Sequence, residues 1–149
     1  MSHEQPLMPP PSTVSTSPAA SSSSAIATAK TKKILLIEDE LLIQKSLKIL
    51  MERQGAVVDA VSSGREAIKL IAQESYHKII CDLMLQDISG MDVLEEAKKT
   101  YPLIEMGRHF IIITAYSSPQ VLNKAKEYGC QVISKPFQNL EVVITQFLR

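Results

Sequence analysis

The sequence predicts an α/β fold with a doubly wound, five-stranded parallel sheet in the strand order 2-1-3-4-5. Two observations predict it. Five short apolar runs are too short for helices and lack polar alternation, which is typical of strands buried on both faces. Each run precedes a segment with helical spacing of its apolar residues. Strict alternation of strand and helix indicates a parallel sheet with helices on both faces and right-handed crossovers.

The composition fits one globular domain with some excess length. The chain has 149 residues, 45% hydrophobic and 21% charged, and its 16 basic and 16 acidic residues balance. A balanced charge argues against a nucleic-acid-binding surface. No apolar run approaches membrane-spanning length and no signal peptide is apparent, so we expect a cytoplasmic protein. Cys81 and Cys130 lie in or beside predicted strands and are expected to be reduced thiols in the core.

Residues 1–30 differ from the remainder of the chain. They contain Pro9, Pro10 and Pro11, a run of serines at 21–24, and few large apolar side chains. Such a segment cannot bury enough apolar surface to offset the entropy lost on ordering. We therefore expect a disordered Ser/Pro/Ala-rich tail at 1–30 and a folded domain at 31–149.

In the first half of the domain the sequence predicts strands at Ile34–Ile37, Ala56–Val61 and Lys78–Asp82, with helices between them at Leu41–Gln54 and Ser63–Glu74. Gly55 is expected to end the first helix. In the second helix Ala67, Ile68 and Ile71 recur at the spacing of one buried face. The third strand is an apolar run that ends in a single carboxylate, Asp82.

In the second half the sequence predicts strands at Phe110–Thr114 and Gln131–Ser134. Helices are predicted at Met91–Thr100, Ser118–Gly129 and Leu140–Leu148, and loops at Gln86–Gly90 and Tyr101–His109. Pro102 and Gly107 favour a loop for the segment before the fourth strand. Pro119 suits the first turn of a helix.

Polar side chains follow four of the five predicted strands. Glu38 and Asp39 come after the first strand, Asp82 ends the third, Thr114 ends the fourth and Lys135 follows the fifth. In the order 2-1-3-4-5 the switch point, where the strand order reverses, lies between strands one and three, and ligands bind at such a point outside the carboxyl ends of the strands. For Asp82 alone, a residue that caps a turn is an equally good interpretation; the combination favours a site.

The combination also indicates a chemistry. Three converging acids repel one another unless a cation joins them, and all-oxygen ligands select a hard cation, most simply Mg²⁺. An ammonium group and a hydroxyl group opposite that cation suit the oxygens of a phosphoryl group. The carboxylate of Asp82 would then be the nucleophile.

At this point the chain resembles the receiver domain of two-component response regulators, which has a flavodoxin-like fold. The resemblance covers residues 32–149 and rests on four motifs. They are Ile34-Leu35-Leu36-Ile37-Glu38-Asp39-Glu40, Cys81-Asp82-Leu83-Met84 with Gly90 eight residues after the aspartate, Ile113-Thr114-Ala115, and Ser134-Lys135-Pro136-Phe137.

The resemblance implies a role for each residue. Asp82 accepts phosphate from a histidine kinase or phosphotransfer protein, and Mg²⁺ is bound by Asp39, by Asp82, by the backbone carbonyl of Met84, and through water by Glu38. Thr114 and Lys135 contact the phosphoryl group. The Lys135–Pro136 bond is expected to be cis.

Four positions bear on how this receiver would work. Gln86 stands where the family often has proline, four residues after the phosphorylated aspartate. Val132 stands where the family usually has an aromatic residue that rotates as a switch. Met84 and Tyr116 occupy the positions that flank the path of hydrolytic water, and both are bulky, so we expect slow autodephosphorylation. Tyr116 is also a candidate to replace the missing aromatic switch, with a plain exposed loop residue as the equal alternative.

We expect a single-domain response regulator, because the sequence leaves little room after the last helix for an output domain. It would catalyse only its own phosphorylation and dephosphorylation and signal by phosphorelay or by binding an effector on its fourth-helix, fifth-strand, fifth-helix face, without nucleic acid or membrane. One alternative is a receiver-fold binding module that works without phosphorylation, which Val132 favours mildly. The other is a phosphohydrolase; such enzymes usually carry a second aspartate where Met84 stands.

Overall fold

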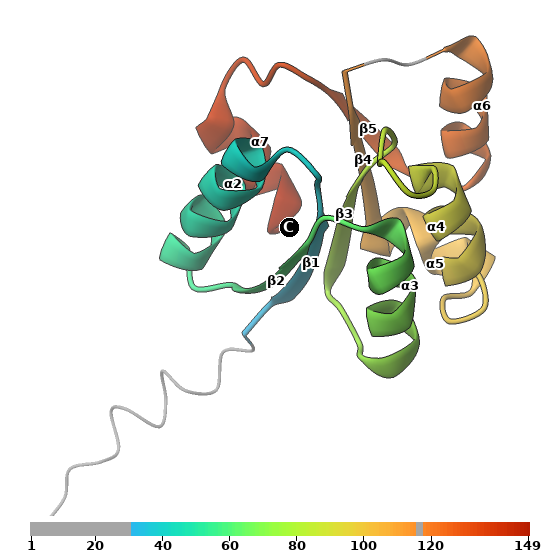
Figure 1. The fold of residues 1–149 in the computed structure, drawn as a ribbon, viewed down its shortest axis with the longest axis horizontal. Helices are drawn as coiled ribbons and strands as arrows, with labels where there is room; N and C mark the ends of the chain where they lie inside the picture. The colour runs from blue at the N-terminus through green and yellow to red at the C-terminus, as the bar shows by residue number, and fades with distance from the viewer. Residues whose placement is uncertain (1–30, 116–117) are drawn as a thin grey trace, which may run out of the picture. The chain divides into compact units, whose positions relative to one another are not determined.

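The structure is a computed structural model that describes residues 31–115 and 118–149. Its five strands form one parallel sheet in the order β2-β1-β3-β4-β5, which confirms the predicted topology (Figure 1). The strands are β1 (Lys33–Ile37), β2 (Val57–Val61), β3 (Lys78–Asp82), β4 (Phe110–Thr114) and β5 (Gln131–Ser134).

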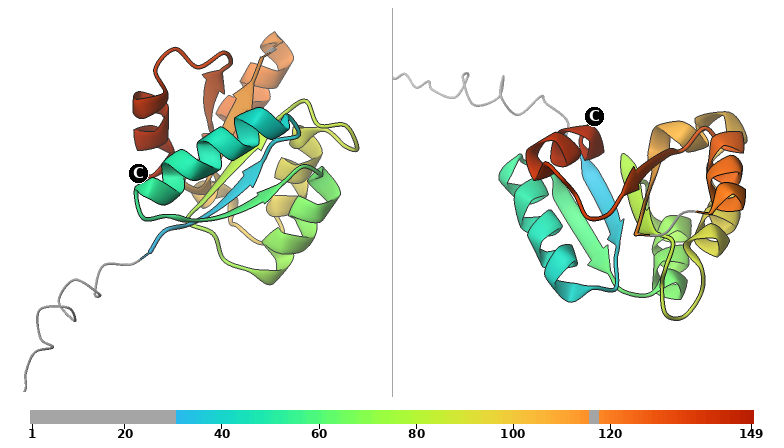
Figure 2. Two further views of the ribbon diagram at one scale, coloured as in Figure 1. Left: turned by 60° about the vertical axis from the view of Figure 1, so that its left-hand side comes forward. Right: turned by 90° about the horizontal axis from the view of Figure 1, so that it is seen from above.

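Helices cover both faces of the sheet. They are α2 (Leu41–Arg53), α3 (Gly64–Gln73), α4 (Gly90–Ala97), α5 (Leu103–His109), α6 (Pro119–Glu127) and α7 (Leu140–Phe147). Helices α2 and α7 lie on one face, and α3, α4, α5 and α6 lie on the other (Figures 1 and 2). Each face has its own hydrophobic cluster, so the sheet is the middle layer of three.

The three central strands explain why the apolar runs are continuous. Almost every residue of β1, β3 and β4 is buried, whereas the edge strands β2 and β5 are partly exposed. A central strand contacts helices on both sides, so successive side chains are apolar although they point to opposite faces. Each buried Ile or Leu stabilises the fold by about 1.5–3 kcal/mol.

The ends of the helices follow local signals. Gly55 and Gly129 come just after α2 and α6 and have φ angles of 94° and 71°, which glycine adopts without strain. The Ser63 side chain caps α3 by accepting a hydrogen bond from Glu66 N, and Ser118 caps α6 in the same way, with Pro119 in the first turn.

The predicted loop at Tyr101–His109 is wrong, because most of it is helix α5. Pro102 occupies the N-cap, where the missing N–H of proline is no loss. Gly107 lies inside the helix, and this position requires glycine because a Cβ atom there would come within 2.2 Å of the Gly129 carbonyl oxygen. The glycine therefore serves a close backbone contact between distant segments. Helix α4 also ends at Ala97 rather than at Thr100.

Both cysteines in the described residues are buried and form no disulfide, as expected. Burial raises the pKa of the Cys130 thiol to about 11 and raises the pKa of Cys81 further, so both remain protonated. None of the helices in the described ranges has the length and apolar character needed to cross a membrane. The predicted tail at 1–30 falls outside the described residues and stays a prediction.

Candidate functional site

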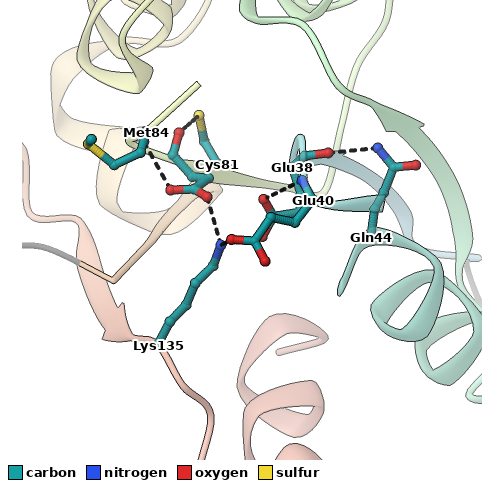
Figure 3. A network of polar contacts seen from close by, with 7 residues as sticks. Glu38, Glu40, Gln44, Cys81, Met84 and Lys135 are labelled. Carbon is teal, nitrogen blue, oxygen red and sulfur yellow. Dashed lines mark hydrogen bonds and ion pairs between the residues drawn. The ribbon is translucent and has the colours of Figure 1, made fainter. Parts of the chain in front are cut away.

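The residues predicted to meet at the carboxyl edge of the sheet do meet there. Lys135 Nζ lies 2.7 Å from Asp82 Oδ2 and 2.5 Å from Glu38 Oε1 (Figure 3). The backbone N–H of Lys135 donates to the Thr114 carbonyl oxygen at 2.9 Å, and this bond continues the pairing of β4 with β5. The ends of β1, β3, β4 and β5 therefore form one site.

Lys135 is a buried cation held by carboxylates. Only 7% of its side chain is exposed. A third carboxylate oxygen, Glu40 Oε1, lies 3.8 Å from Lys135 Nζ. Burial alone lowers the pKa of Lys135, but the carboxylates of Asp82 and Glu38 outweigh burial and hold the pKa above its ordinary value. The Lys135–Pro136 bond is cis, as the resemblance implied.

Glu38 is the most enclosed acid of the site. Its side chain is fully buried, and this burial, together with the neighbouring Asp82, raises its pKa to about 7 against the opposing effect of Lys135. The backbone N–H of Glu40 donates to Glu38 Oε2 at 3.2 Å, and the Gln44 side chain donates to the Glu38 carbonyl oxygen at 2.8 Å. The first bond orients the Glu38 carboxylate, and the second holds the backbone from which it projects.

Asp82 uses its two oxygens differently. Oδ1 accepts a hydrogen bond from Met84 N at 3.0 Å, which is the turn-capping role that was the alternative interpretation. Oδ2 accepts from Lys135 Nζ at 2.7 Å. Asp82 therefore both shapes the turn after β3 and presents an oxygen to the site, although only 3% of the residue is exposed.

Three acids cluster tightly enough to share a cation. Glu38, Asp39 and Asp82 each offer a carboxylate oxygen, and these oxygens lie within 4.8 Å of one another. One lysine cannot balance three carboxylates, and the donors are all oxygen, so the set fits a hard divalent cation such as Mg²⁺. Burial is the main reason that the pKa of Glu38 is raised, and the neighbouring Asp82 raises it further.

The remaining predicted residues frame this centre. Thr114 is 1% exposed at the end of β4, whereas Met84 is 60% exposed on the other side of Asp82. Val132 is half-buried in β5 and packs against the hydrophobic cluster of the α3–α6 face, so β5 carries no aromatic ring at that position. Tyr116 lies outside the described residues, so its predicted role stays a sequence-based expectation.

Sequence reasoning missed three polar residues around the site. Glu40 was visible as the third acid after the first strand, but nothing indicated its contact with Lys135. Gln44 lies one helical turn into α2 and binds the backbone of Glu38. Asp87 accepts hydrogen bonds from residues at the start of α3, 22 to 24 positions earlier in the chain, a separation with no local signal.

Together the fold and the site define a class: a flavodoxin-like α/β protein whose acids and single buried lysine meet at the switch point of the sheet. The family model for the response regulator receiver domain matches residues 34–145. The chain belongs to that family, and with it to two-component signalling.

Curated relatives agree with this assignment. The transcriptional regulatory protein SrrA of Staphylococcus aureus (strain NCTC 8325 / PS 47) is 33% identical over 118 residues, which cover 76% of this chain and 46% of SrrA. The transcriptional regulatory protein ZraR of Escherichia coli (strain K12) is 28% identical over 118 residues, covering 77% of this chain and 26% of ZraR. The chain thus spans less than half the length of these relatives.

Solved structures agree as well. The CheY-like response regulator receiver domain protein of Methanospirillum hungatei JF-1 has a TM-score of 0.71 and 27% identity, covering 78% of this chain and 90% of that chain. A response regulator of Burkholderia pseudomallei, solved with a phosphorylated aspartic acid, calcium ion and citrate, has a TM-score of 0.67 and 26% identity. That match covers 78% of this chain and 66% of the Burkholderia chain.

Proposed function

We propose that this receiver accepts a phosphoryl group on Asp82 from a phosphohistidine of a histidine kinase or phosphotransfer protein, in a Mg²⁺-dependent reaction. The observation that carries the proposal is the contact between Asp82 Oδ2 and Lys135 Nζ at 2.7 Å inside the acid cluster. The similar Burkholderia regulator, which contains a phosphorylated aspartic acid and a calcium ion, supports it.

The transfer balances without a further reactant. One Asp82 carboxylate oxygen forms a bond to phosphorus while the bond from phosphorus to the donor imidazole nitrogen breaks, and the electron pair returns to that nitrogen. The product is an acyl phosphate. Hydrolysis reverses the modification when water attacks phosphorus, the Asp82 carboxylate is regenerated and inorganic phosphate leaves.

The residues around Asp82 divide the remaining work. Lys135 is already a cation beside Asp82, so its ammonium is placed to pair with the added phosphoryl oxygens, and Thr114 supplies a hydroxyl from the end of β4. We assign Asp39, Asp82 and the Met84 carbonyl as direct holders of Mg²⁺, with Glu38 acting through water. When bound, Mg²⁺ supplies positive charge to the phosphoryl oxygens and offsets the repulsion among the acids.

We further propose a cytoplasmic regulator that signals through proteins. Its only catalysis would be its own phosphorylation and dephosphorylation. The expected docking face is formed by α6, β5 and α7. These are the fourth helix, fifth strand and fifth helix that were predicted from the sequence. The balanced charge supports a role without nucleic acid. The relatives SrrA and ZraR are named as transcriptional regulatory proteins, so binding to DNA should be tested by an electrophoretic mobility shift assay. A shift of DNA by this protein would contradict the proposed role without nucleic acid.

A second function, a binding module that works without phosphorylation, is favoured by one observation. Val132, a half-buried residue that packs against the hydrophobic cluster, stands where the family usually has the aromatic switch. Against it stands the buried Lys135 between Glu38 and Asp82, a costly arrangement that a phosphorylation site explains and a plain binding surface does not.

The deciding experiment is incubation with acetyl phosphate or phosphoramidate and Mg²⁺, read by intact mass. We expect one added phosphoryl group on the natural protein, and none on Asp82→Asn or in the presence of a chelator. Asp92→Asn is the matched control, since Asp92 is an acid of the α4 capping box outside the site. If the natural protein gains no phosphoryl group from either donor, the binding module is the better account.

A further inference from the structure

The loop that carries Met84 is tied to a distant helix by Asp87. Asp87 Oδ1 accepts a hydrogen bond from Gly64 N at 2.9 Å, and Oδ2 accepts from Arg65 N at 3.0 Å and from Ser63 Oγ at 2.8 Å. The first N–H groups of a helix have no partner within the helix. The Asp87 carboxylate thus satisfies the open end of α3 from outside.

This contact is ionic as well as geometric. The amino end of a helix carries a partial positive charge, which favours a carboxylate there. The hydrogen bonds from Arg65 N, Gly64 N and Ser63 hold the pKa of Asp87 well below its usual range, so it stays charged. Ser63 joins the two systems, because its oxygen also caps the Glu66 N–H at 3.2 Å.

Packing holds the same loop at two points. Beside Asp87, Ile88 lies so close to Gly64 that a Cβ atom on the glycine would come within 2.6 Å of Ile88 Cγ1. At the far end, Gly90 N donates to the Leu83 carbonyl oxygen at 3.0 Å, and a Cβ atom on Gly90 would meet the Asp82 carbonyl oxygen at 2.4 Å. Between these two anchors lies Met84, whose backbone N–H donates to Asp82 Oδ1 at 3.0 Å.

Within that stretch the chain has lost one local restraint. Gln86 stands where related receivers often have proline, and glutamine does not restrict φ as the proline ring does. A carbonyl group that is to bind a metal needs a fixed direction, since a misplaced ligand weakens the site. Asp87, the residue next to Gln86, supplies a restraint from another element, because its carboxylate binds the amino end of α3.

We propose that Asp87 is a positioning residue, which holds the Met84 carbonyl in place for Mg²⁺ by clamping the loop 83–88 to the amino end of α3. This rests on the proposed function for the metal assignment. Helix α3 thereby has a role in the site, although none of its side chains contacts Glu38, Asp39 or Asp82 among the described residues. Greater mobility at the amino end of α3 would make the Met84 carbonyl more mobile.

The test compares Asp87→Ala with a matched control and a rescue variant. Glu66→Gln removes an exposed acid from the first turn of the same helix without touching the loop. Gln86→Pro combined with Asp87→Ala restores the local restraint without the clamp. Two readouts are needed: Mg²⁺ affinity by titration calorimetry, and hydrogen exchange of the amides at 83–88 in metal-free protein.

We expect Asp87→Ala to weaken Mg²⁺ binding by about 10-fold, the effect typical of losing an outer partner of a metal ligand. Exchange should become faster at 83–88 only. Glu66→Gln should leave both readouts unchanged, and the double variant should recover most of the affinity. Recovery by proline separates positioning from a general loss of stability, because a merely unstable protein would not regain metal affinity.

The results distinguish this inference from the proposed function. If the natural protein binds Mg²⁺, Asp82→Asn does not, and Asp87→Ala binds normally, the clamp is wrong while the site stands. If no variant binds Mg²⁺, the metal assignment fails, and the positioning role fails with it. Unchanged exchange at 83–88 in metal-free Asp87→Ala overturns the clamp whatever the metal does, as does a defect that Gln86→Pro leaves uncorrected.

Discussion

At the scale of single residues, the site is built around one buried cation. Lys135 contacts Asp82 and Glu38 and has little exposure to water, so its charge depends on those carboxylates. Removing charges from water costs free energy, and the attraction between the buried charges offsets this cost only while every partner is present. The arrangement is stable as a set and vulnerable to the loss of any member, which suits a site that must respond to an added phosphoryl group.

Removing Lys135 should therefore cost stability in metal-free buffer. We expect Lys135→Ala to lower the free energy of unfolding by about 3–5 kcal/mol, because it leaves Glu38 and Asp82 as uncompensated buried charges. Urea unfolding measures the loss. Lys99→Ala is the control: its pair with Glu96 lies on the surface, where such pairs contribute about 1 kcal/mol or less. An equal effect of both variants would mean that Lys135 does not offset the buried acids.

A second residue-scale prediction concerns the lifetime of the phosphorylated state. Met84 offers no group that directs water, so Met84→Asn, which places an amide two residues after Asp82, should shorten the lifetime several-fold. Release of inorganic phosphate after removal of the donor gives the rate. Gln86→Asn, a polar exchange in the same loop, should not change it.

Tyr116→Ala gives an independent check on the same idea. From the sequence we expect it to shorten the lifetime as well and to weaken phosphorylation-dependent binding of a partner. If Met84→Asn and Tyr116→Ala both leave the lifetime unchanged, bulky shielding of the acyl phosphate is wrong. If Tyr116→Ala also leaves partner binding intact, Tyr116 does not replace the missing aromatic switch.

At the scale of elements, the ends of helices do more than stop and start the chain. The amino end of α3 binds the loop after β3 through Asp87, and the amino end of α4 approaches the backbone of Asp82 at Gly90. Helix α5 adds a short segment before β4 that contacts the turn after α6 through Gly107. Each contact needs either a charge or the absence of a side chain at one position.

The contact of α5 predicts an unusual effect of a helix-favouring substitution. In an exposed helix, changing glycine to alanine adds about 1 kcal/mol of stability. Gly107→Ala should instead destabilise the protein by about 1–3 kcal/mol, because the methyl group would meet the Gly129 carbonyl oxygen. The urea midpoint measures it, with Glu105→Ala in the same helix as a near-neutral control. Stabilisation by Gly107→Ala would show that α5 and Gly129 are not in contact.

At the scale of the whole molecule, the parallel sheet is what makes a site from residues far apart in sequence. All five strands point the same way, so the residues that follow them meet at one edge. The layers of helices bury the sheet on both faces and leave this edge for chemistry. Stability and site are coupled, because the acids lie at the ends of the most buried strands.

That coupling predicts stabilisation by metal. A ligand that binds only the folded state stabilises it by mass action, by about 1.4 kcal/mol at ten times its dissociation constant. We expect Mg²⁺ at that level to raise the melting temperature by several degrees, and less in Asp39→Asn, which removes one oxygen donor. Differential scanning calorimetry measures the shift. Asp92→Asn should behave like the natural protein, and the absence of any shift in the natural protein would contradict the metal site.

A second prediction at this scale concerns residues 1–30. Their Ser/Pro/Ala-rich composition predicts that they contribute little apolar burial, so their deletion should leave the melting temperature nearly unchanged. The same calorimetric scan tests it. A large fall after truncation would show that the segment stabilises the domain.

The sequence by itself determined the topology of the sheet and predicted which acids and which lysine lie at its carboxyl edge. Continuous apolar runs and the helical period of 3.6 are local patterns, and a residue such as Asp82 or Lys135 is placed at a sheet edge by the end of its own apolar run. Only the tertiary structure decided features that depend on partners far along the chain. The sequence indicated a loop at Gly107, because the carbonyl of Gly129 that requires a glycine there is distant in the sequence. No signal in the sequence marked Asp87, because its partners begin at Ser63. Local patterns carry no information about which distant backbone groups will approach, whereas the close packing of the layers brings those groups into contact.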